Sequence, residues 1–238
     1  MQSLILAGGL GTRLHPITHE IPKALVPIRG KPFAAYQLAW LARQGVRDVV
    51  YCIGHKGGQI VDFIGDGGAW GLRVRYVDEG QNLRGTAGAL RLALETTPLD
   101  DTFFVLYGDS FLPIAYPPVF AQHAKSGKPA LMTVLRNENR WDRSNVVYAP
   151  PLVTLYDKRC DDATRAKMTH IDYGLLVISR ALVADEIPDG AIVDLADVLG
   201  QLSRKGELAG YEVVERFYEV GSLAGIADFS DYVDQEGL

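Results

Sequence analysis

An apolar segment near the start of the chain runs directly into a cluster of glycines, and this feature most limits what the chain can fold into. Residues 3–7 have the length and composition of a buried parallel strand, and Gly8, Gly9 and Gly11 follow them. A strand that ends in glycines presents backbone N–H groups where side chains would otherwise block a ligand. Successive amides of this kind form an anion-binding turn. The sequence therefore predicts an anion site at the end of the first strand.

Arg13 and Lys23 follow the glycines and add positive charge to this region. A guanidinium is a planar donor suited to phosphate oxygens, and a lysine ammonium is a mobile point charge. A glycine-rich turn with two surface cations is the alternative interpretation. Two familiar phosphate loops are excluded, because Thr12 stands where a Walker A loop needs lysine, and Leu14 stands where the dinucleotide-binding fingerprint needs glycine.

Strand and helix patterns alternate through the first half of the chain. This alternation predicts a parallel sheet with helices on both faces. The predicted helices are 33–44, 59–64 and 86–94, and the predicted strands are 3–7, 48–53, 72–77 and 102–107.

The second half is less regular but contains no repeat and no linker-like change of composition. The chain of 238 residues therefore predicts a single domain over residues 1–238, with a functional subdivision near residue 112. The predicted helices are 117–126, 194–204 and 222–233, the last capped by Ser222. The predicted strands are 130–135, 171–178 and 208–213, with a hairpin formed by 145–147 and 153–156.

Composition excludes several classes of partner. The net charge is −5 with scattered Lys and Arg, which argues against a nucleic-acid-binding surface. The apolar N-terminal run lacks a basic leader and is as short as a strand, so it predicts neither a signal peptide nor a membrane span. Cys52 and Cys160 favour free thiols in a reducing compartment. We expect a cytoplasmic protein without nucleic-acid or membrane partners.

Residues 4–33, LILAGGLGTRLHPITHEIPKALVPIRGKPF, resemble the signature of sugar-1-phosphate nucleotidyltransferases. The resemblance continues at 85–89 and at 107–110, and it covers most of the chain. It is strongest to small bacterial enzymes, namely mannose- and heptose-1-phosphate guanylyltransferases and muramic acid 1-phosphate uridylyltransferase. It implies a Rossmann-like mixed, mostly parallel sheet flanked by helices, of the nucleotide-diphospho-sugar transferase type, and the use of Mg²⁺. Dimers are common in such enzymes, so the resemblance also implies a possible homodimer.

The resemblance assigns nucleotide contacts to two loops, one after the first strand and one at the start of the third predicted helix. These residues are Leu6, Ala7, Gly8, Gly9, Gly11, Thr12, Arg13, Lys23, Asn82, Gly85, Thr86 and Gly88.

Asp109 and Glu219 are the predicted metal ligands. Asp109 follows a buried strand, where ligands bind in open α/β sheets, and Mg²⁺ takes few protein oxygens because it keeps its waters. The resemblance places Glu219 where the family usually has aspartate, so it binds the metal directly or through water. The alternatives are that Asp109 caps the next segment and that Glu219 is a surface residue near a helix N-terminus.

Four residues are predicted to bind the sugar phosphate. Asp157 and Lys158 resemble the family's Glu-Lys pair, in which the lysine holds the acceptor phosphate and the acid holds a sugar hydroxyl. Asp172 and Tyr173, in a strand by the same expected cleft, are further candidates for sugar contacts. An exposed lysine at a strand end is the alternative interpretation of Lys158.

The expected reaction joins a nucleoside triphosphate to a sugar 1-phosphate, giving an NDP-sugar for polysaccharide precursors and pyrophosphate. Two unit charges 4 Å apart repel by about 4 kcal/mol at an effective dielectric of 20, so neutralising charge is the main task. Arg13, Lys23 and Asp109 are the predicted catalytic residues. GTP with a mannose- or heptose-like sugar is favoured over UTP. The alternatives are a cytidylyltransferase for a non-sugar phosphate or phosphonate and a non-catalytic nucleotide-sensing module.

Overall fold

The computed structural model describes residues 1–80 and 82–238 and divides into two compact units. Unit 1 comprises residues Met1–Leu83, Leu106–Pro113 and Phe217–Leu238, and unit 2 comprises Arg84–Val105 and Ile114–Arg216. The single-domain organisation of residues 1–238 stays a prediction.

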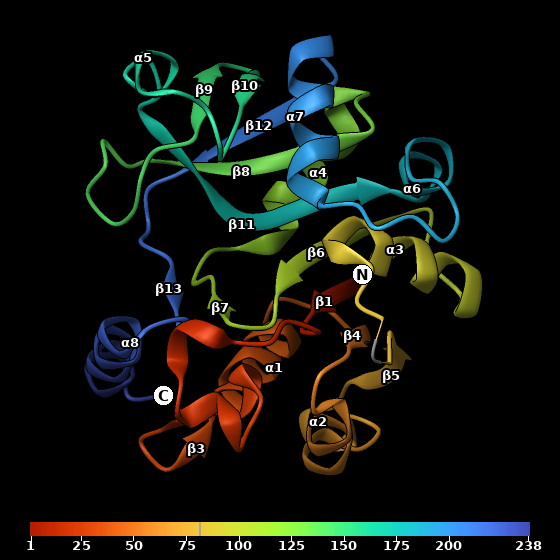
Figure 1. The fold of residues 1–238 in the computed structure, drawn as a ribbon, viewed down its shortest axis with the longest axis vertical. Coiled ribbons are helices and arrows are strands. Elements are labelled where there is room, and N and C mark those ends of the chain that lie inside the picture. The colour runs from red at the N-terminus through yellow and green to blue at the C-terminus, as the bar shows by residue number, and fades with distance from the viewer. Residues whose placement is uncertain (81) are drawn as a thin grey trace. The chain divides into compact units, whose positions relative to one another are not determined.

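Unit 1 contains a parallel sheet in the order β5 (Arg73–Asp78), β4 (Asp48–Ile53) and β1 (Gln2–Leu6) (Figure 1). All five residues of β1 are buried, as expected for a parallel strand covered on both faces. Leu6 pairs with Cys52 at the end of the strands, so the glycine-rich loop begins beside the end of β4.

The helices of unit 1 enclose an aromatic core. Phe229 of the last helix packs against Phe33, Tyr36 and Phe111, with ring centroids 4.9–5.6 Å apart. The α-helices are α1 (Phe33–Arg43), α2 (Gly57–Ile64) and α8 (Leu223–Glu236), and the 3-10 helices are η1 (Thr12–Leu14), η2 (Ile17–His19), η3 (Lys23–Leu25) and η4 (Gly68–Trp70). A small antiparallel pair, β2 (Pro27–Ile28) and β3 (Lys31–Pro32), precedes α1.

Two further strands of unit 1 are only two residues long. β7 (Ser110–Phe111) pairs antiparallel with β13 (Tyr218–Glu219), which places Glu219 opposite Ser110. The N–H of Val220 donates to the carbonyl of Asp109 at 2.9 Å. This pairing brings together two segments that are far apart in the sequence.

Unit 2 contains a mixed sheet in which β8 and β12 pair in parallel and the other neighbours are antiparallel. The order is β6 (Thr102–Tyr107, its last two residues in unit 1), β11 (His170–Ser179), β8 (Ala130–Arg136), β12 (Leu208–Val213), β10 (Leu152–Tyr156) and β9 (Val146–Ala149). The helices are α3 (Gly85–Thr96), α4 (Tyr116–Ser126), α5 (Asp162–Arg165), α6 (Arg180–Glu186) and α7 (Leu195–Lys205).

The structure confirms an α/β fold with a mixed sheet flanked by helices. Each predicted helix and strand is present with its ends within three residues of the prediction, and Ser222 caps α8 by accepting the N–H of Gly225 at 3.0 Å. The short strands β7 and β13 and the helices α5 and α6 were not predicted, because segments this short carry no clear periodicity. In the part of the chain that the structure describes, no helix is long and apolar enough to cross a membrane.

Candidate active site

The glycine-rich loop of unit 1 presents a row of backbone donors. Ala7 still donates to the carbonyl of Cys52 at 2.8 Å, but among the described residues the N–H groups from Gly9 to Arg13 donate to no protein acceptor. Gly9, Thr12 and Arg13 are exposed. Consecutive unpaired amides at the end of a parallel strand are suited to an anion such as a phosphate group.

Gly11 fixes the shape of this loop. Its φ is 69°, a left-handed conformation that glycine adopts without strain, and it opens η1. A Cβ there would lie 2.8 Å from Cγ2 of Thr18 and 3.1 Å from Cγ of Lys23. The Thr18 hydroxyl donates to the carbonyl of Gly11 at 2.8 Å. Thr18 therefore supports the loop, and nothing in the sequence pattern indicated it.

Arg13, Lys23 and Asp109 meet beside Gly221. Nζ of Lys23 donates to Oδ2 of Asp109 at 2.9 Å, and both side chains are 20% exposed. A Cβ on Gly221 would lie 3.4 Å from Nη2 of Arg13 and 3.8 Å from Oδ2 of Asp109. Three residues that the sequence proposed separately thus lie around one backbone position in unit 1.

A buried network holds the turn that carries Asp109. Nε2 of Gln37, in α1, donates to the carbonyls of Tyr107 and Ser110, each at 2.8 Å. The hydroxyl of Tyr51 donates to Oε1 of Gln37 at 3.3 Å. Burial raises the pKa of Tyr51, so this hydroxyl stays protonated and remains a donor. Sequence reasoning missed Gln37, whose signal is a polar residue at a buried position of a mainly apolar helix.

Asp109 and Glu219 are the two carboxylates of this region predicted to bind a hard cation. Glu219 lies in β13 opposite Ser110, the neighbour of Asp109. Carboxylate oxygens are the ligands that Mg²⁺ prefers, and one or two suffice because the ion keeps waters. Among the described residues, no group of three or more His, Cys, Asp or Glu side chains is placed to hold a metal. Magnesium binding stays a prediction.

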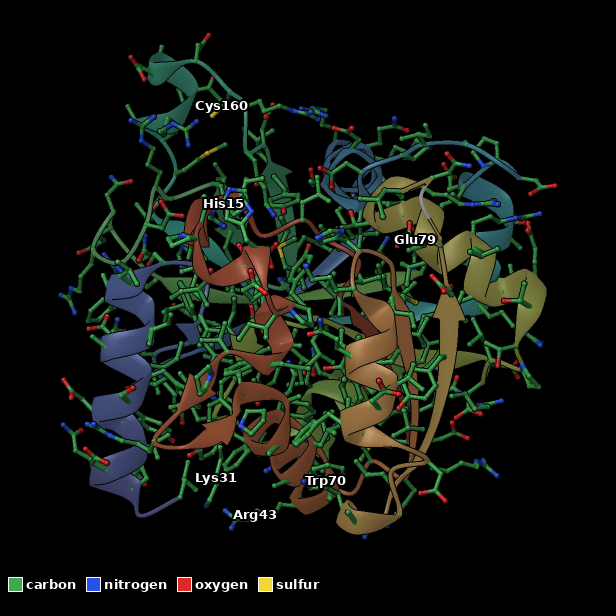
Figure 2. The ribbon with its side chains drawn as sticks, turned by 60° about the horizontal axis from the view of Figure 1, so that its bottom comes forward. His15, Lys31, Arg43, Trp70, Glu79 and Cys160 are labelled. Carbon is green, nitrogen blue, oxygen red and sulfur yellow. The ribbon has the colours of Figure 1, made fainter. Side chains whose placement is uncertain are left out.

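A second feature of unit 1 is a cavity of about 580 Å³ beside the glycine-rich loop. A Cβ on Gly8 would lie 2.5 Å from Oε1 of Glu79, which directly follows β5, so this carboxylate lies against the loop (Figure 2). Burial, and then the Glu79 charge, raise the pKa of the Cys52 thiol to about 12, which excludes it as a nucleophile. Asn82 is exposed. The residues that line the cavity are Leu10, Gly54, His55, Lys56, Asp78, Gly80 and Leu83.

In unit 2, the predicted second nucleotide loop, at the start of α3, is hydrogen-bonded to residues 193–195. The carbonyl of Val193 accepts from Ala87 at 3.0 Å and from Gly88 at 3.3 Å. The Thr86 hydroxyl donates to Oδ1 of Asp194 at 3.0 Å and accepts from the N–H of Leu195 at 2.7 Å. The first turn of α3 is therefore covered by residues 193–195. Nucleotide contacts of Gly85, Thr86 and Gly88 stay a prediction.

Asp172 anchors Lys158 in unit 2. Its carboxylate accepts the Tyr156 hydroxyl at 2.8 Å and the Gly174 N–H at 3.0 Å, and it lies 3.7 Å from Nζ of Lys158. The Asp172 side chain is 3% exposed, whereas that of Lys158 is 42% exposed. A buried anion thus fixes a cation that still reaches solvent. Tyr156, which sequence reasoning missed, looks like an ordinary apolar strand residue.

The other two predicted sugar residues have different surroundings. Oδ2 of Asp157 accepts from Nη2 of Arg204 at 3.0 Å, and its Oδ1 accepts the N–H of Arg159 at 2.8 Å. Tyr173 is 1% exposed. Asp157 and Lys158 line a cavity of about 580 Å³ in unit 2, together with α7 residues that include Asp197 and Arg204. Sugar contacts of Asp157, Asp172 and Tyr173 stay predictions.

Comparison with known proteins gives a consistent picture. A family model described as nucleotidyl transferase matches residues 2–144, more than half of the chain. A Synechocystis UTP–glucose-1-phosphate uridylyltransferase is 30% identical over 82% of this chain and 53% of its own length. A Campylobacter jejuni D-glycero-alpha-D-manno-heptose 1-phosphate guanylyltransferase is 33% identical over 62% of each chain. The chain thus spans less than two thirds of either relative.

The fold is also shared with solved structures. A Bacillus anthracis protein crystallised with sucrose matches with a TM-score of 0.83 at 20% identity, over 98% of this chain and 94% of that one. At this identity the match supports the fold alone. The relatives named above differ in both nucleotide and sugar, so the comparisons leave the substrates open.

Proposed function

The chain belongs to the nucleotidyl transferase family, and we propose that it joins a nucleoside triphosphate to a sugar 1-phosphate, forming an NDP-sugar and releasing pyrophosphate. One observation carries this proposal. Arg13, Lys23 and Asp109 lie around Gly221, next to a loop of unpaired amides. Two cations, backbone donors and a carboxylate suited to a metal ion are what a triphosphate tail requires.

The proposed chemistry depends on charge neutralisation and alignment. An acceptor phosphate is anionic near neutral pH, so its oxygen attacks the α-phosphorus without a general base. The loop amides and Arg13 hold the departing pyrophosphate, while Lys23 faces the α-phosphate. Asp109 and Glu219 would hold Mg²⁺, which when bound supplies further positive charge to the phosphates. Lys23 would then exchange its ion pair with Asp109 for the substrate phosphate.

The residues at the cavity beside Gly8 favour GTP over UTP as the nucleotide substrate. Leu10 and Leu83 supply apolar contacts for a base, and the Glu79 carboxylate lies at the loop. An ionised carboxylate only accepts hydrogen bonds. Guanine presents two adjacent donors, N1–H and the N2 amino group, whereas uracil presents a single N3–H. A carboxylate therefore favours guanine by one additional charge-assisted hydrogen bond.

Lys158 is the proposed ligand of the acceptor phosphate. Asp172 lies beside its ammonium on the buried side, and the Lys158 side chain as a whole remains 42% exposed. The cavity it lines contains paired charges such as Asp157 with Arg204, which suit the alternating donors and acceptors of sugar hydroxyls. We infer a mannose- or heptose-like sugar for this position. A cytoplasmic location and a homodimer also belong to this proposal.

The proposal is tested with the four common NTPs against a set of sugar 1-phosphates and phosphocholine, with Mg²⁺ present. Product mass identifies the nucleotide sugar, and pyrophosphate is measured in parallel. We expect GTP with mannose 1-phosphate or a heptose 1-phosphate to give most product. If phosphocholine alone were turned over, the acceptor would not be a sugar phosphate. If no combination released pyrophosphate, the proposed enzymatic activity would be wrong. Glu79→Gln should reduce the preference for GTP over UTP. The glutamine NH₂ group would face one of the two guanine donors, so one of the two hydrogen bonds could not form.

A further inference from the structure

Unit 1 contains a second cavity, of about 250 Å³, that shares no residue with the glycine-rich loop or with the cavity beside Glu79. Its walls come from α1, from η4 and from β7. Figure 2 shows Lys31, Arg43 and Trp70 near one another at its rim. Neither the family resemblance nor the proposed reaction uses it.

The cavity has aromatic walls around a gap between small residues. Ala35 and Ala39 are four residues apart on α1 and therefore lie on one face of that helix. Trp40, Trp70 and Phe111 surround them, with the Trp40 and Phe111 ring centroids 5.6 Å apart. An apolar cavity of about 150 Å³ accommodates benzene. The larger volume here is sufficient for a ligand with about two fused rings.

The charged side chains at the rim have one sign. Lys31 and Arg43 are exposed, and none of the described side chains that line the cavity is acidic. Nζ of Lys31 lies 5.5 Å from the Tyr36 ring centroid. Nε1 of Trp40 is buried and has no hydrogen-bond partner among the described residues. An apolar interior with two cations at the rim complements a molecule with a ring-sized apolar body and a negative group.

We propose that this cavity binds an aromatic carboxylate or sulfonate and acts as an effector site. Phe111, which forms part of its wall, lies in β7 two residues after Asp109. β7 pairs with β13, which contains Glu219. An occupant in contact with Phe111 therefore contacts the two-stranded element that contains Glu219 and that directly follows Asp109 in the chain. This coupling, unlike the binding itself, rests on the proposed function.

The binding is tested on the full chain with 2-naphthoate and its neutral isostere 2-naphthamide. Calorimetry gives the affinity, and tryptophan fluorescence gives a local readout, since two of the three tryptophans line the cavity. We expect one naphthoate per chain, retained with saturating GTP and Mg²⁺, and weaker binding of the amide. Removing both rim cations, in Lys31→Gln with Arg43→Gln, should weaken naphthoate at least about tenfold. Lys125→Gln, an exposed lysine of α4, is the matched control and should leave it unchanged.

Ala39→Phe should fill the cavity and abolish binding, and Ala35→Leu provides a second filling variant if the first disturbs the fold. Equal affinity for the amide, displacement by GTP, or unchanged binding in both filled variants would overturn the site. Light scattering that showed a dimer dissociated by Ala39→Glu would assign the cavity to a second copy instead.

The coupling is tested by the Mg²⁺ concentration for half-maximal pyrophosphate release. We expect naphthoate to shift it at least twofold in the wild type only, and no shift would overturn the coupling. If no pyrophosphate is released at all, the proposed function fails while the binding result stands.

Discussion

The charged groups proposed to bind substrates are held differently in the two units. In unit 1, Lys23 and Asp109 form one ion pair beside glycines, and their positions follow from backbone turns. In unit 2, Lys158 is positioned by Asp172, which is itself fixed by the Tyr156 hydroxyl and the Gly174 amide. The arrangement in unit 1 depends on glycines, which leave room for the charged groups. The arrangement in unit 2 depends on hydrogen bonds among buried groups.

This difference predicts different consequences of mutation. Lys23 and Asp109 are each other's ion-pair partners, and under the proposed function we expect both to be required for chemistry. Asp172 is 3% exposed and has donors on both oxygens, so we expect it to affect the acceptor phosphate only through Lys158. We therefore expect kcat effects in unit 1 and KM effects for the sugar phosphate in unit 2.

The largest effect is expected for Lys23→Ala. Loss of a preorganised donor at the α-phosphate should lower kcat by about 10²-fold or more. Asp109→Asn should lower it comparably and raise the Mg²⁺ requirement. Pyrophosphate release at saturating substrates measures both. Arg73→Ala, an exposed cation at the start of β5 that pairs with Asp48, is the control. A Lys23→Ala enzyme of full rate would remove the basis for the comparison.

Gln37→Leu tests whether the unit 1 site also depends on a buried side chain. The substitution removes the side-chain donor to the carbonyls of Tyr107 and Ser110, and losing a hydrogen bond to a buried polar group costs about 1–3 kcal/mol. We expect the turn around Asp109 to shift and kcat to fall about tenfold, with a lower urea midpoint. Tyr51→Phe removes only the outer bond and should change kcat less than threefold. If Gln37→Leu loses stability but keeps kcat, the network supports the fold and not the site.

Tyr156→Phe sharpens the comparison on the side of unit 2. It removes one hydrogen bond to the Asp172 carboxylate without changing the shape of the ring. Bonds to charged groups contribute about 1.5–3 kcal/mol, part of which Gly174 and Lys158 retain. We expect KM for the sugar 1-phosphate to rise about fivefold, with kcat and the KM for NTP nearly unchanged. Thr154→Val, at an exposed position of β10, is the control. A change confined to kcat would place Asp172 in the chemistry.

The same contrast explains what the sequence alone was able to predict. Gly8, Gly11, Arg13 and Lys23 lie within one short segment, and glycine has few roles other than a turn or a close approach, so a tight loop with cations beside it was predictable. The parallel strands were predictable because burial on both faces leaves an uninterrupted apolar run.

The partners of the unit 2 residues were not predictable in this way. Asp172 pairs with Tyr156 and Thr86 with Asp194, contacts between positions 16 and 108 residues apart. Local pattern carries no information on such pairs, because tertiary packing decides them. Gln37 and Thr18 escaped notice for the same reason, since each has an ordinary residue type for a helix and a turn.

The smallest expected effect concerns acid sensitivity, which should originate in unit 2. His123 of α4 is 7% exposed, and its Nε2 is buried without a partner among the described residues. Burial lowers its pKa, although backbone hydrogen bonds at Pro129 and Lys128 partly oppose this. Below the ordinary pKa of about 6.5, the unfolded chain takes up a proton that the folded chain does not. The free energy of unfolding should therefore fall with decreasing pH, by at most about 1.4 kcal/mol per pH unit.

Urea unfolding of the full chain at pH 7, 6 and 5 measures this slope. His123→Gln should flatten the decline below pH 6.5, because glutamine does not titrate. The three histidines of unit 1 are all exposed, so His55→Gln is the matched control and should follow the wild type. Parallel pH profiles for His123→Gln and the wild type would show that the acid response arises elsewhere. The His123 imidazole would then not cause the pH dependence of the free energy of unfolding. The two units would differ only in how they hold the charged groups proposed to bind substrates.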